Sequence, residues 1–308
     1  MKVAVKLRSV DNIWDKYIEK LKNEADTILI YDEHLEEIYN DVQVMITTHI
    51  DLATLSKFPD LKKIILFKTG MDGLPVEQLE QKGISLECSH ANSSLIAEHA
   101  VALAFSLLHR IPEFHNDLCN GIWYSDGKNY YWKSISDLTV GILGFGEIGK
   151  QIFKNIEGFT RDIIVLNKSG RYSENVVAAN DFIDFIKRSD LIFICIPKTA
   201  ETTDLFDRNI INLMLGKYIV NVARAEIINE EALYDALSKN ILAGYAGDVW
   251  YNAPNKKNKT ERVKPSNFSF EKLNNVIMSP HCSTHEKSAH ERYIQDAVNK
   301  CIAYIKYR

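Results

Sequence analysis

The sequence predicts an α/β protein made of two open parallel β-sheets, each with helices on both faces. Three observations favour this fold class. The 308 residues suffice for about two domains. Short β-branched runs alternate with amphipathic stretches through both halves of the chain. One predicted strand-to-helix turn carries a glycine-rich motif. Because parallel strands need crossover connections, this alternation favours parallel sheets.

The first half of the chain predicts five strands joined by short helices. Runs rich in valine, isoleucine and leucine mark the strands, which we expect at residues 3–7, 27–31, 42–48, 64–67 and 85–88. Amphipathic stretches mark the helices, which we expect at residues 11–23, 34–39, 52–58 and 76–82. Right-handed crossovers then place these helices on both faces of one sheet.

The second half begins with a long apolar helix, expected from Ser94 to Cys119 with a serine as its N-cap. Residues 120–136 break the pattern with glycines and aromatic side chains, which indicates a domain junction or a contact arm. A second alternating series follows from Leu138, and a final helix is expected at residues 285–306. The strands of this series are expected at residues 139–143, 163–166, 191–196, 219–222, 243–249 and 276–278.

Composition and charge argue against several classes of protein. The formal net charge is −4 with both signs interspersed, so no basic face for nucleic acid is expected. The lysine-rich run at 256–264 indicates a solvated loop. No apolar stretch approaches the ~18 residues of a membrane span, and the first residues do not resemble a signal peptide. The five cysteines form no pair at CxxC spacing, so we expect a reduced, cytoplasmic protein without a metal centre.

The glycine-rich motif follows the predicted strand at 139–143 and opens a helix. Its residues are Gly144, Phe145, Gly146, Glu147, Ile148 and Gly149. We expect the first glycine to permit a tight turn, the second to let a pyrophosphate approach the backbone, and the third to let helix and strand pack closely. Amide groups at the helix start would meet the anionic phosphates. The sequence therefore predicts a dinucleotide cofactor held by this motif.

The end of the next strand favours NADP over NAD. An NAD enzyme usually places a carboxylate here for the ribose 2′-hydroxyl, and a carboxylate would repel a 2′-phosphate. This chain instead has Asn167, Lys168, Ser169 and Arg171, whose neutral, basic and hydroxyl groups suit a phosphate dianion. A solvated basic turn is the alternative interpretation, which leaves NAD open as the cofactor.

Three polar segments fall at the carboxyl ends of predicted strands, where open α/β sheets bind ligands. Arg224 follows one apolar strand, and its guanidinium would form a fixed fork for a carboxylate or for a carbonyl oxygen that gains negative charge. Asp248 follows a second strand. His281 follows a third strand and a proline, and an imidazole can exchange a proton near neutral pH. Behind one dinucleotide motif, the three segments predict a catalytic site.

The order of these motifs resembles the D-2-hydroxyacid dehydrogenase family, which includes glyoxylate/hydroxypyruvate reductases, phosphoglycerate dehydrogenases and formate dehydrogenases. The resemblance spans nearly the whole chain. It rests on the glycine motif and on the three strand ends. Further segments that carry it are Thr69-Gly70-Met71-Asp72, Asn92, Ala97-Glu98-His99, Gly121-x-Trp123 and Ile196-Pro197-x-Thr199.

The resemblance implies a reaction and roles for individual residues. A hydride would pass from the nicotinamide to a 2-keto acid, with glyoxylate or hydroxypyruvate as candidate substrates. Arg224 would bind the carboxylate and keto oxygen of the substrate, and His281 would exchange the proton. Backbone amides at Gly70 and Met71 would hold the substrate carboxylate, and Asn92 would help to shape that site.

The resemblance also implies an architecture. A Rossmann cofactor domain at residues 94–284 would be inserted into a flavodoxin-like substrate-binding domain formed by residues 1–93 and 285–308. Asp248 would hold the carboxamide of the nicotinamide. Three loop residues would also contact the cofactor, namely Pro197, Thr199 and Thr202. The enzyme would be a homodimer, with residues 120–136 contributing to the contact.

One departure from the family concerns the partner of His281. The family has a glutamate five residues after the aspartate, just before a proline, which hydrogen-bonds the histidine and favours its protonated form. Here Ala253 occupies that position, ahead of Pro254. Three interpretations stay open. Another acid, Glu226 or Glu98, replaces the glutamate. Alternatively, the reaction needs no proton transfer, as in formate dehydrogenases, which have glutamine there. The third is a cofactor-sensing binding protein with little turnover.

Overall fold

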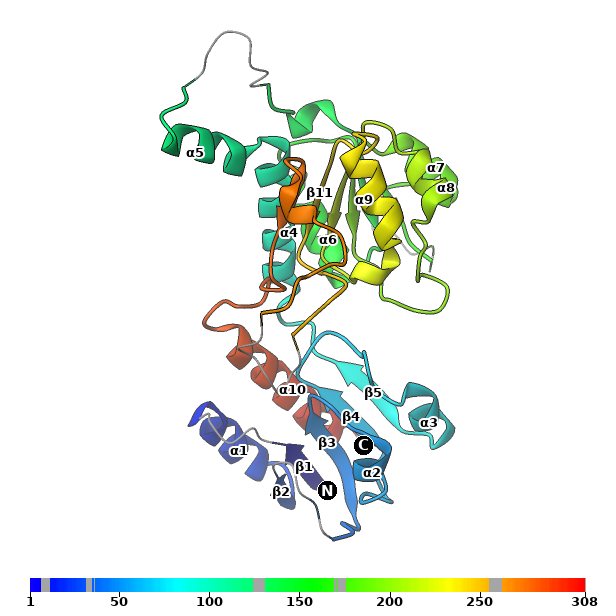
Figure 1. Ribbon diagram of the computed structural model, residues 1–308. Coiled ribbons are helices and arrows are strands. Elements are labelled where there is room, and N and C mark those ends of the chain that lie inside the picture. The colour runs from blue at the N-terminus through cyan, green and yellow to red at the C-terminus, as the bar shows by residue number, and fades with distance from the viewer. Residues whose placement is uncertain are drawn as a thin grey trace. The chain divides into compact units, whose positions relative to one another are not determined.

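A computed structural model describes residues 1–6, 12–31, 35, 37–123, 131–168, 170, 176–254 and 262–307. The chain divides into two units (Figure 1). The first joins Met1–Asn92 to His285–Arg308, and the second is Ser93–Thr284. Each unit has its own parallel sheet, so the predicted fold class, two doubly wound α/β domains, is confirmed.

The first unit contains a five-stranded sheet in the order β2-β1-β3-β4-β5, with every neighbouring pair parallel. This is the strand order of flavodoxin-like folds. Its strands are β1 (Lys2–Lys6), β2 (Thr27–Tyr31), β3 (Val42–Thr47), β4 (Lys63–Leu66) and β5 (Ser85–Cys88). Its helices are α1 (Asp15–Lys22), α2 (Leu52–Leu55), α3 (Val76–Gln81) and α10 (Ala289–Lys306), with a 3-10 turn at Asn12–Trp14.

Alternate side chains of these strands enter two separate cores. Val3, Val5 and Ile65 pack with buried residues of α1 and α10 on one face. Ala4 and Ile64 pack with buried residues of α2 and α3 on the other face. Figure 1 shows α1 beside α10, as the contacts between these helices require. The period-2 alternation of the strands therefore produces the covered parallel sheet expected from the sequence.

The second unit contains a seven-stranded parallel sheet in the order β12-β11-β10-β9-β6-β7-β8. Its strands are β6 (Val140–Leu143), β7 (Ile163–Leu166), β8 (Val177–Ala178), β9 (Leu191–Ile194), β10 (Tyr218–Asn221), β11 (Gly244–Gly247) and β12 (Val276–Met278). The order reverses between β6 and β9, which is the Rossmann topology. Such a reversal opens a crevice at the carboxyl ends of the strands, where ligands bind.

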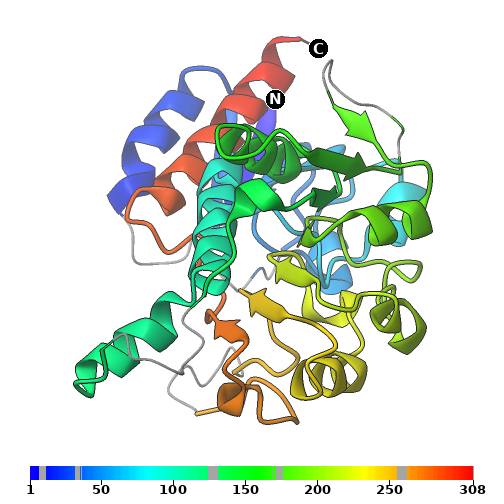
Figure 2. The same cartoon turned by 90° about the horizontal axis from the view of Figure 1, so that it is seen from above.

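Helices cover both faces of this sheet. The helices are α4 (Ser93–Leu108), α5 (Ile111–Cys119), α6 (Glu147–Ile156), α7 (Phe182–Arg188), α8 (Arg208–Asn212) and α9 (Glu230–Ser238), with 3-10 turns at Ile135–Asp137, Ala225–Ile227 and Phe270–Lys272. Helices α4 and α6 share one core with the sheet, while α7, α8 and α9 share the other. Figure 2 shows α4 (teal) and α9 (yellow) on opposite sides of the strands.

Several predicted boundaries are correct and others shift. The strands expected at 27–31, 85–88, 163–166 and 276–278 match β2, β5, β7 and β12 to the residue, and the other predicted strands differ by one or two residues at an end. The short strand β8 was not predicted, because two exposed residues give no periodic signal. The last helix begins at Ala289 rather than residue 285, since residues before it form a turn in which Glu286 accepts from the Ser288 N–H at 2.9 Å.

The helix predicted at 34–39 is wrong for the described residues of that stretch. Tyr39 donates its N–H to the Lys57 carbonyl at 2.8 Å, and its ring stacks on Phe58 at 5.6 Å. These tertiary contacts anchor Tyr39 in a non-helical conformation. Short isolated helices are marginal, so such contacts override a weak amphipathic pattern.

The long helix expected at 94–119 is also wrong, because it is broken into α4 and α5. Pro112 lies in the first turn of α5 and has no N–H to give to the Leu108 carbonyl. The Leu108 carbonyl instead accepts from the Lys133 N–H at 2.9 Å, and Arg110 adopts a left-handed φ of 54°. The two helices are therefore bent by 58° at their junction.

Among the described residues, no single helix is both long enough and apolar enough to cross a membrane. Helices α4 and α5 reach that length and hydropathy only when they are taken together across their bend. Much of α4 is buried in the core of its own unit.

Candidate active site

The glycine motif forms the turn between β6 and α6, and each glycine has a distinct structural reason. Gly144 has a left-handed φ of 97°, and a Cβ there would lie 3.0 Å from the Cys195 backbone. A Cβ on Gly149 would lie 2.1 Å from the Gly144 carbonyl oxygen, so this position tolerates no side chain. Gly146 faces open space and begins α6 without a side-chain cap. The first amides of α6 thus have room in front of them, which fits the pyrophosphate of a dinucleotide.

The other motif residues take different positions. Phe145 is buried and packs edge-on against Phe153 at 5.9 Å, so its side chain belongs to the core and only its backbone can face a cofactor. Ile148 is half-buried on α6. Glu147 is exposed in the first turn of α6 and pairs with Lys150 at 3.0 Å. The motif therefore offers backbone rather than side chains to a ligand.

The end of β7 is described only in part. Asn167 and Lys168 follow the strand, whereas the predicted Ser169 and Arg171 lie outside the described residues. Lys168 is exposed and pairs with Glu201 at 2.5 Å. This hydrogen bond, together with the lysine charge, lowers the pKa of Glu201. Lys168 thus already has an anionic partner on the neighbouring loop.

The loop after β9 is held by its own hydroxyl groups. The Thr202 hydroxyl donates to the Pro197 carbonyl at 2.8 Å and accepts from the Thr199 N–H at 2.7 Å. The Thr199 hydroxyl accepts from the Thr202 N–H at 3.2 Å. These contacts give both threonines a structural role, and they fix the shape of the loop at the carboxyl edge of the sheet.

Arg224 lies at the carboxyl end of β10, as predicted. The Asn221 side chain clamps its backbone, because the Nδ2 group donates to the Arg224 carbonyl at 2.9 Å and Oδ1 accepts from the Ala223 N–H at 3.0 Å. Nearby, Lys198 pairs with Glu226 at 2.6 Å. Partial burial raises the pKa of Glu226, but the hydrogen bond from Lys198 and the charges of Lys198 and Arg224 outweigh it, so the pKa is lowered.

Asp248 follows β11 and is the most heavily hydrogen-bonded acid of this edge among the described residues. Its Oδ1 accepts from the Ser279 hydroxyl at 2.6 Å and from the Cys282 N–H at 2.9 Å. Its Oδ2 accepts from the Ser283 N–H at 3.0 Å. Burial raises the pKa of Asp248, but hydrogen bonds from His99, Ser279, Cys282 and Ser283 outweigh it and hold the pKa well below its usual range. The carboxylate therefore stays ionised at any physiological pH.

His281 lies at the carboxyl end of β12 and has a left-handed φ of 56°. This conformation is uncommon for a residue other than glycine and is typical of functional sites. The two residues after His281 donate their N–H groups to Asp248, so the aspartate holds the strained turn in place. The side chain is exposed, and no described residue hydrogen-bonds the ring.

Arg224, Asp248 and His281 therefore follow three adjacent parallel strands, β10, β11 and β12. The strand ends are tied together by backbone hydrogen bonds. The Asp248 N–H donates to the Asn221 carbonyl at 3.0 Å, and the Ser279 N–H donates to the Gly247 carbonyl at 2.9 Å. The three side chains predicted from the sequence thus lie along one edge of one sheet.

The predicted substrate residues lie in the first unit. Gly70 and Met71 follow β4, and neither donates its N–H to another described residue. The preceding Thr69 hydroxyl lies 2.8 Å from the Tyr293 hydroxyl of α10, which anchors this loop. Asn92 is buried and donates from Nδ2 to the Ala289 carbonyl at 2.8 Å, while its Oδ1 has no hydrogen-bond partner among the described residues.

Comparison with known proteins identifies the family. Residues 101–283, more than half of the chain, match the model of the D-isomer specific 2-hydroxyacid dehydrogenase, NAD binding domain. The chain belongs to the D-2-hydroxyacid dehydrogenase family. It is an NAD(P)-dependent oxidoreductase of this type, as the resemblance implied.

Individual relatives of this dehydrogenase agree with the assignment. It is 27% identical to a glyoxylate reductase of Thermofilum pendens, over 85% of this chain and 77% of that protein. It is 31% identical to a D-3-phosphoglycerate dehydrogenase of Methanocaldococcus jannaschii, over 90% of this chain but only 53% of that longer protein. An NADPH-dependent glyoxylate/hydroxypyruvate reductase of Sinorhizobium meliloti, solved with NADP and malonate, superposes with a TM-score of 0.76 at 21% identity, covering 98% of this chain and 93% of that one.

Ala253 stands where the family has the acidic partner of the histidine, and within the described residues neither candidate replacement bonds to His281. Ala253 is exposed and precedes Pro254. Glu226 is engaged by Lys198, and Glu98 is exposed on α4. No hydrogen bond or ion pair joins either acid to His281 in the part of the chain that the structure describes.

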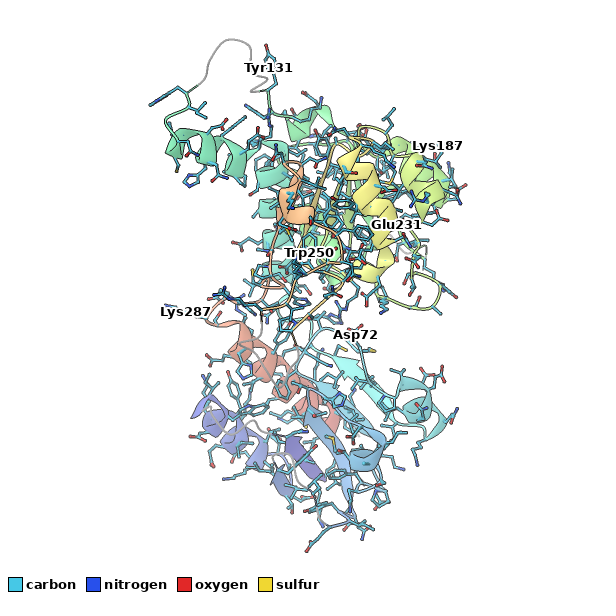
Figure 3. The ribbon with its side chains drawn as sticks, in the orientation of Figure 1. Asp72, Tyr131, Lys187, Glu231, Trp250 and Lys287 are labelled. Atoms are coloured by element: carbon cyan, nitrogen blue, oxygen red, sulfur yellow. The ribbon has the colours of Figure 1, made fainter. Side chains whose placement is uncertain are left out.

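Sequence reasoning missed the side chains that support Asp248. His99 of α4 places Nε2 2.8 Å from the Ser279 hydroxyl and 3.5 Å from Asp248 Oδ1. The indole N–H of Trp250, labelled in Figure 3, donates to the Ser279 carbonyl at 3.0 Å. His99 belongs to the Ala97-Glu98-His99 segment that carried the family resemblance, so a signal was present. It gave no distance, because His99 and Ser279 are far apart in the chain.

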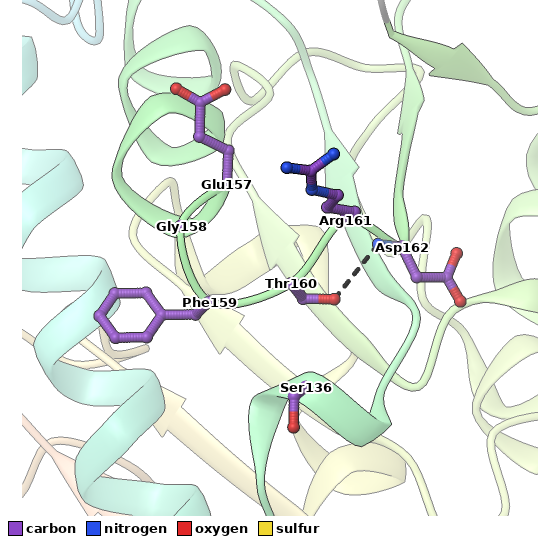
Figure 4. Close-up of a pocket in the computed structure, with 7 residues that line it drawn as sticks. All are labelled: Ser136, Glu157, Gly158, Phe159, Thr160, Arg161 and Asp162. Atoms are coloured by element: carbon purple, nitrogen blue, oxygen red, sulfur yellow. Dashed lines mark hydrogen bonds between the residues drawn. The ribbon is translucent and has the colours of Figure 1, made fainter.

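A surface pocket lies at the other edge of the sheet. It is lined by Ser136 and by Glu157–Asp162, and the Asp162 N–H donates to the Thr160 hydroxyl at 3.2 Å (Figure 4). These residues precede β6 and β7, whereas the glycine motif and the three strand ends follow their strands. The pocket is therefore separate from the candidate active site.

Proposed function

We propose that this dehydrogenase reduces a small 2-keto acid, such as glyoxylate or hydroxypyruvate, to the 2-hydroxy acid and prefers NADPH. The observation that carries the proposal is the alignment of Arg224, Asp248 and His281 on three adjacent strand ends. The same sheet carries the glycine turn that fits a dinucleotide. The nicotinamide supplies the hydride, and the protein supplies binding, orientation and a proton.

The chain's own residues take the following roles in this proposal. The guanidinium of Arg224 binds the substrate carboxylate and stabilises the negative charge that develops on the keto oxygen. His281 donates a proton to that oxygen. The N–H groups of Gly70 and Met71, which bond to no other described residue, hold the carboxylate, and Asn92 shapes the site beside them. We accordingly assign substrate binding to the first unit and dinucleotide binding to the second.

Asp248 has acceptor capacity left for the nicotinamide carboxamide. A carboxylate offers about four lone-pair directions. Oδ1 already accepts from Ser279 and Cys282, but Oδ2 accepts only from Ser283 among the described residues. An amide N–H of the carboxamide can therefore bind Oδ2 without displacing a protein hydrogen bond.

The experiment that tests the function is a panel of 2-keto acids assayed with NADPH and NADH. We expect consumption of the reduced cofactor with small keto acids. Tight cofactor binding without turnover on any keto acid, or on formate with the oxidised cofactor, would favour the cofactor-sensing alternative. The observation that favours this alternative is that no described residue hydrogen-bonds the His281 ring.

Replacing Ala253 with glutamate should raise kcat near neutral pH by about tenfold, because it restores an acid that can orient His281 and favour its protonated form. Ala253 is exposed, so the larger side chain has room. Ala253→Gln serves as the control, since glutamine can orient the ring but carries no charge, and it should give a smaller gain. If both variants match the wild-type rate, the missing acid does not limit this reaction.

The preference for NADPH rests on the absence of a carboxylate at Asn167 and on the basic side chain of Lys168. Replacing Asn167 with aspartate should lower the ratio of kcat/KM for NADPH to that for NADH by about 10- to 100-fold, since a hydrogen bond to a charged group contributes roughly 1.5–3 kcal/mol. Asn167→Ser keeps the site neutral and should change the ratio little. An unchanged ratio in the aspartate variant would show that residue 167 does not contact the ribose 2′ group of the cofactor.

We also propose that the dehydrogenase is a cytoplasmic homodimer. Three aromatic side chains on either side of residues 124–130 are exposed: Trp123 (73% exposed), Tyr131 (82%) and Trp132 (53%). Figure 3 shows the exposed side chain of Tyr131. Exposed tryptophan and tyrosine side chains are enriched at protein interfaces. The five free cysteines suit a reducing compartment. Sedimentation should give twice the chain mass of 35.2 kDa, and Trp123→Glu should shift it toward the monomer.

A further inference from the structure

Three side chains with metal-binding atoms converge behind the strand ends of the second unit. They are His99 of α4, Asp248 after β11 and Cys282 after β12, and their ligand atoms all lie within 4.8 Å of one another. The Ser279 hydroxyl lies among them, 2.8 Å from His99 Nε2, 2.6 Å from Asp248 Oδ1 and 3.2 Å from Cys282 Sγ. One small polar group therefore occupies the place where the three donors meet.

The donor set matches the chemistry of Zn²⁺. Zinc binds imidazole nitrogen, thiolate sulfur and carboxylate oxygen at about 2.0–2.3 Å in tetrahedral geometry, which separates neighbouring ligand atoms by about 3.3–3.8 Å. His99 Nε2 and Asp248 Oδ1 are already 3.5 Å apart. A thiolate ligand disfavours Mg²⁺ and Ca²⁺, which prefer oxygen. The spacing of the three residues along the chain resembles no metal motif, so the sequence gave no reason to expect this site.

We propose that His99, Asp248 and Cys282 form a Zn²⁺ site whose occupancy excludes the nicotinamide end of the cofactor and so inhibits the enzyme. Binding releases the thiol proton of Cys282 and breaks the hydrogen bond from Ser279 to Asp248, which frees Oδ1 as a ligand. The bound ion then carries one charge-neutralising carboxylate, one thiolate, one neutral imidazole and a water. His99 and Cys282 are partly exposed, so the ion can enter from solvent.

The exclusion has a simple electrostatic cause. Oδ2 of Asp248 is the acceptor proposed for the nicotinamide carboxamide, and coordination of Oδ1 draws the carboxylate charge toward the ion, which weakens Oδ2 as an acceptor. With one carboxylate and one thiolate bound, the occupied site carries no net charge, so the cationic ring of the oxidised nicotinamide loses the attraction of the Asp248 carboxylate. The exclusion of the nicotinamide rests on the proposed function, whereas the metal site does not.

Cobalt spectroscopy tests the site directly, without any assay of activity. Co²⁺ added to chelator-treated full-length protein should produce the thiolate-to-cobalt charge-transfer band and the intense visible bands of tetrahedral cobalt. Zn²⁺ should displace Co²⁺ and so remove the charge-transfer band and the visible bands. Cys282→Ala should abolish the charge-transfer band and weaken Zn²⁺ binding by more than about 100-fold, since even partners outside the coordination shell contribute 10- to 100-fold. The Cys282 N–H that binds Asp248 is a backbone group and persists in this variant.

Cys119→Ala is the matched control, because Cys119 is exposed and its Sγ lies 3.6 Å from His115 Nε2. The cobalt spectrum should be unchanged in this variant. The proposal is overturned if Cys282→Ala keeps the charge-transfer band while it still binds NADP⁺, or if Cys119→Ala loses it. NADP⁺ titrated into the cobalt-loaded protein should reduce the visible bands as it saturates. Bands that persist under saturating NADP⁺ would refute the exclusion but leave the metal site standing.

Discussion

Replacing Arg224 with alanine should lower kcat/KM for the keto acid by about 10³-fold or more, and leave the affinity for NADPH within a few-fold. Removing a single donor to a developing oxyanion costs about 10²–10³ in rate. Arg224 is assigned both the keto oxygen and the carboxylate, so the two losses combine. The fold should survive, because the Asn221 side chain holds the backbone of residue 224 rather than its guanidinium.

The variant Arg224→Lys separates the contribution of the positive charge from that of the planar guanidinium. Lysine keeps the positive charge but cannot form the planar two-pronged contact, so it should recover only part of the activity. Initial rates over a range of keto-acid concentrations give kcat/KM, and quenching of tryptophan fluorescence gives the affinity for NADPH. A turnover within tenfold of wild type in Arg224→Ala would remove this residue from the reaction. A large loss of NADPH affinity would instead assign it to the cofactor.

The parts of the site that were predictable from the sequence depend on backbone conformation and strand order. Gly144 is required because its φ is left-handed. Gly149 is required because a Cβ there would lie 2.1 Å from the Gly144 carbonyl oxygen. Arg224 and His281 could be placed because the carboxyl ends of parallel strands share one edge. Both inferences use local periodicity and a general rule of α/β folds, which need no knowledge of distances.

The parts that were not predictable depend on packing between distant residues. His99 reaches Ser279 because α4 packs across β10, β11 and β12, and a sequence does not state which turn of a helix faces which strand end. The left-handed turn at His281 could not be predicted from the sequence for the same reason, because Asp248, which follows a different strand, holds it in place. By contrast, the break between α4 and α5 could have been predicted. Pro112 alone forbids a continuous hydrogen-bond ladder there.

Replacing His281 with asparagine should lower kcat by about 10²–10⁴-fold, the usual contribution of a general acid, while KM for the keto acid changes far less. Asparagine is the appropriate replacement because it tolerates the left-handed φ of 56° that this position requires, whereas a β-branched residue would add strain. The backbone donors of Cys282 and Ser283 to Asp248 should then persist, and the affinity for NADPH with them.

The pH profile distinguishes loss of the acid from loss of structure. The part of the wild-type pH profile that depends on the proton donor should be absent from His281→Asn. Adding Ala253→Glu to this variant should give no gain, since the glutamate would have no imidazole to orient. A His281→Asn enzyme that keeps the wild-type pH profile, or a double variant that gains as much as Ala253→Glu alone, would assign the proton to another group. Either result would remove His281 from the reaction. Of the two residues assigned to the reacting carbonyl, only Arg224 would then keep its role.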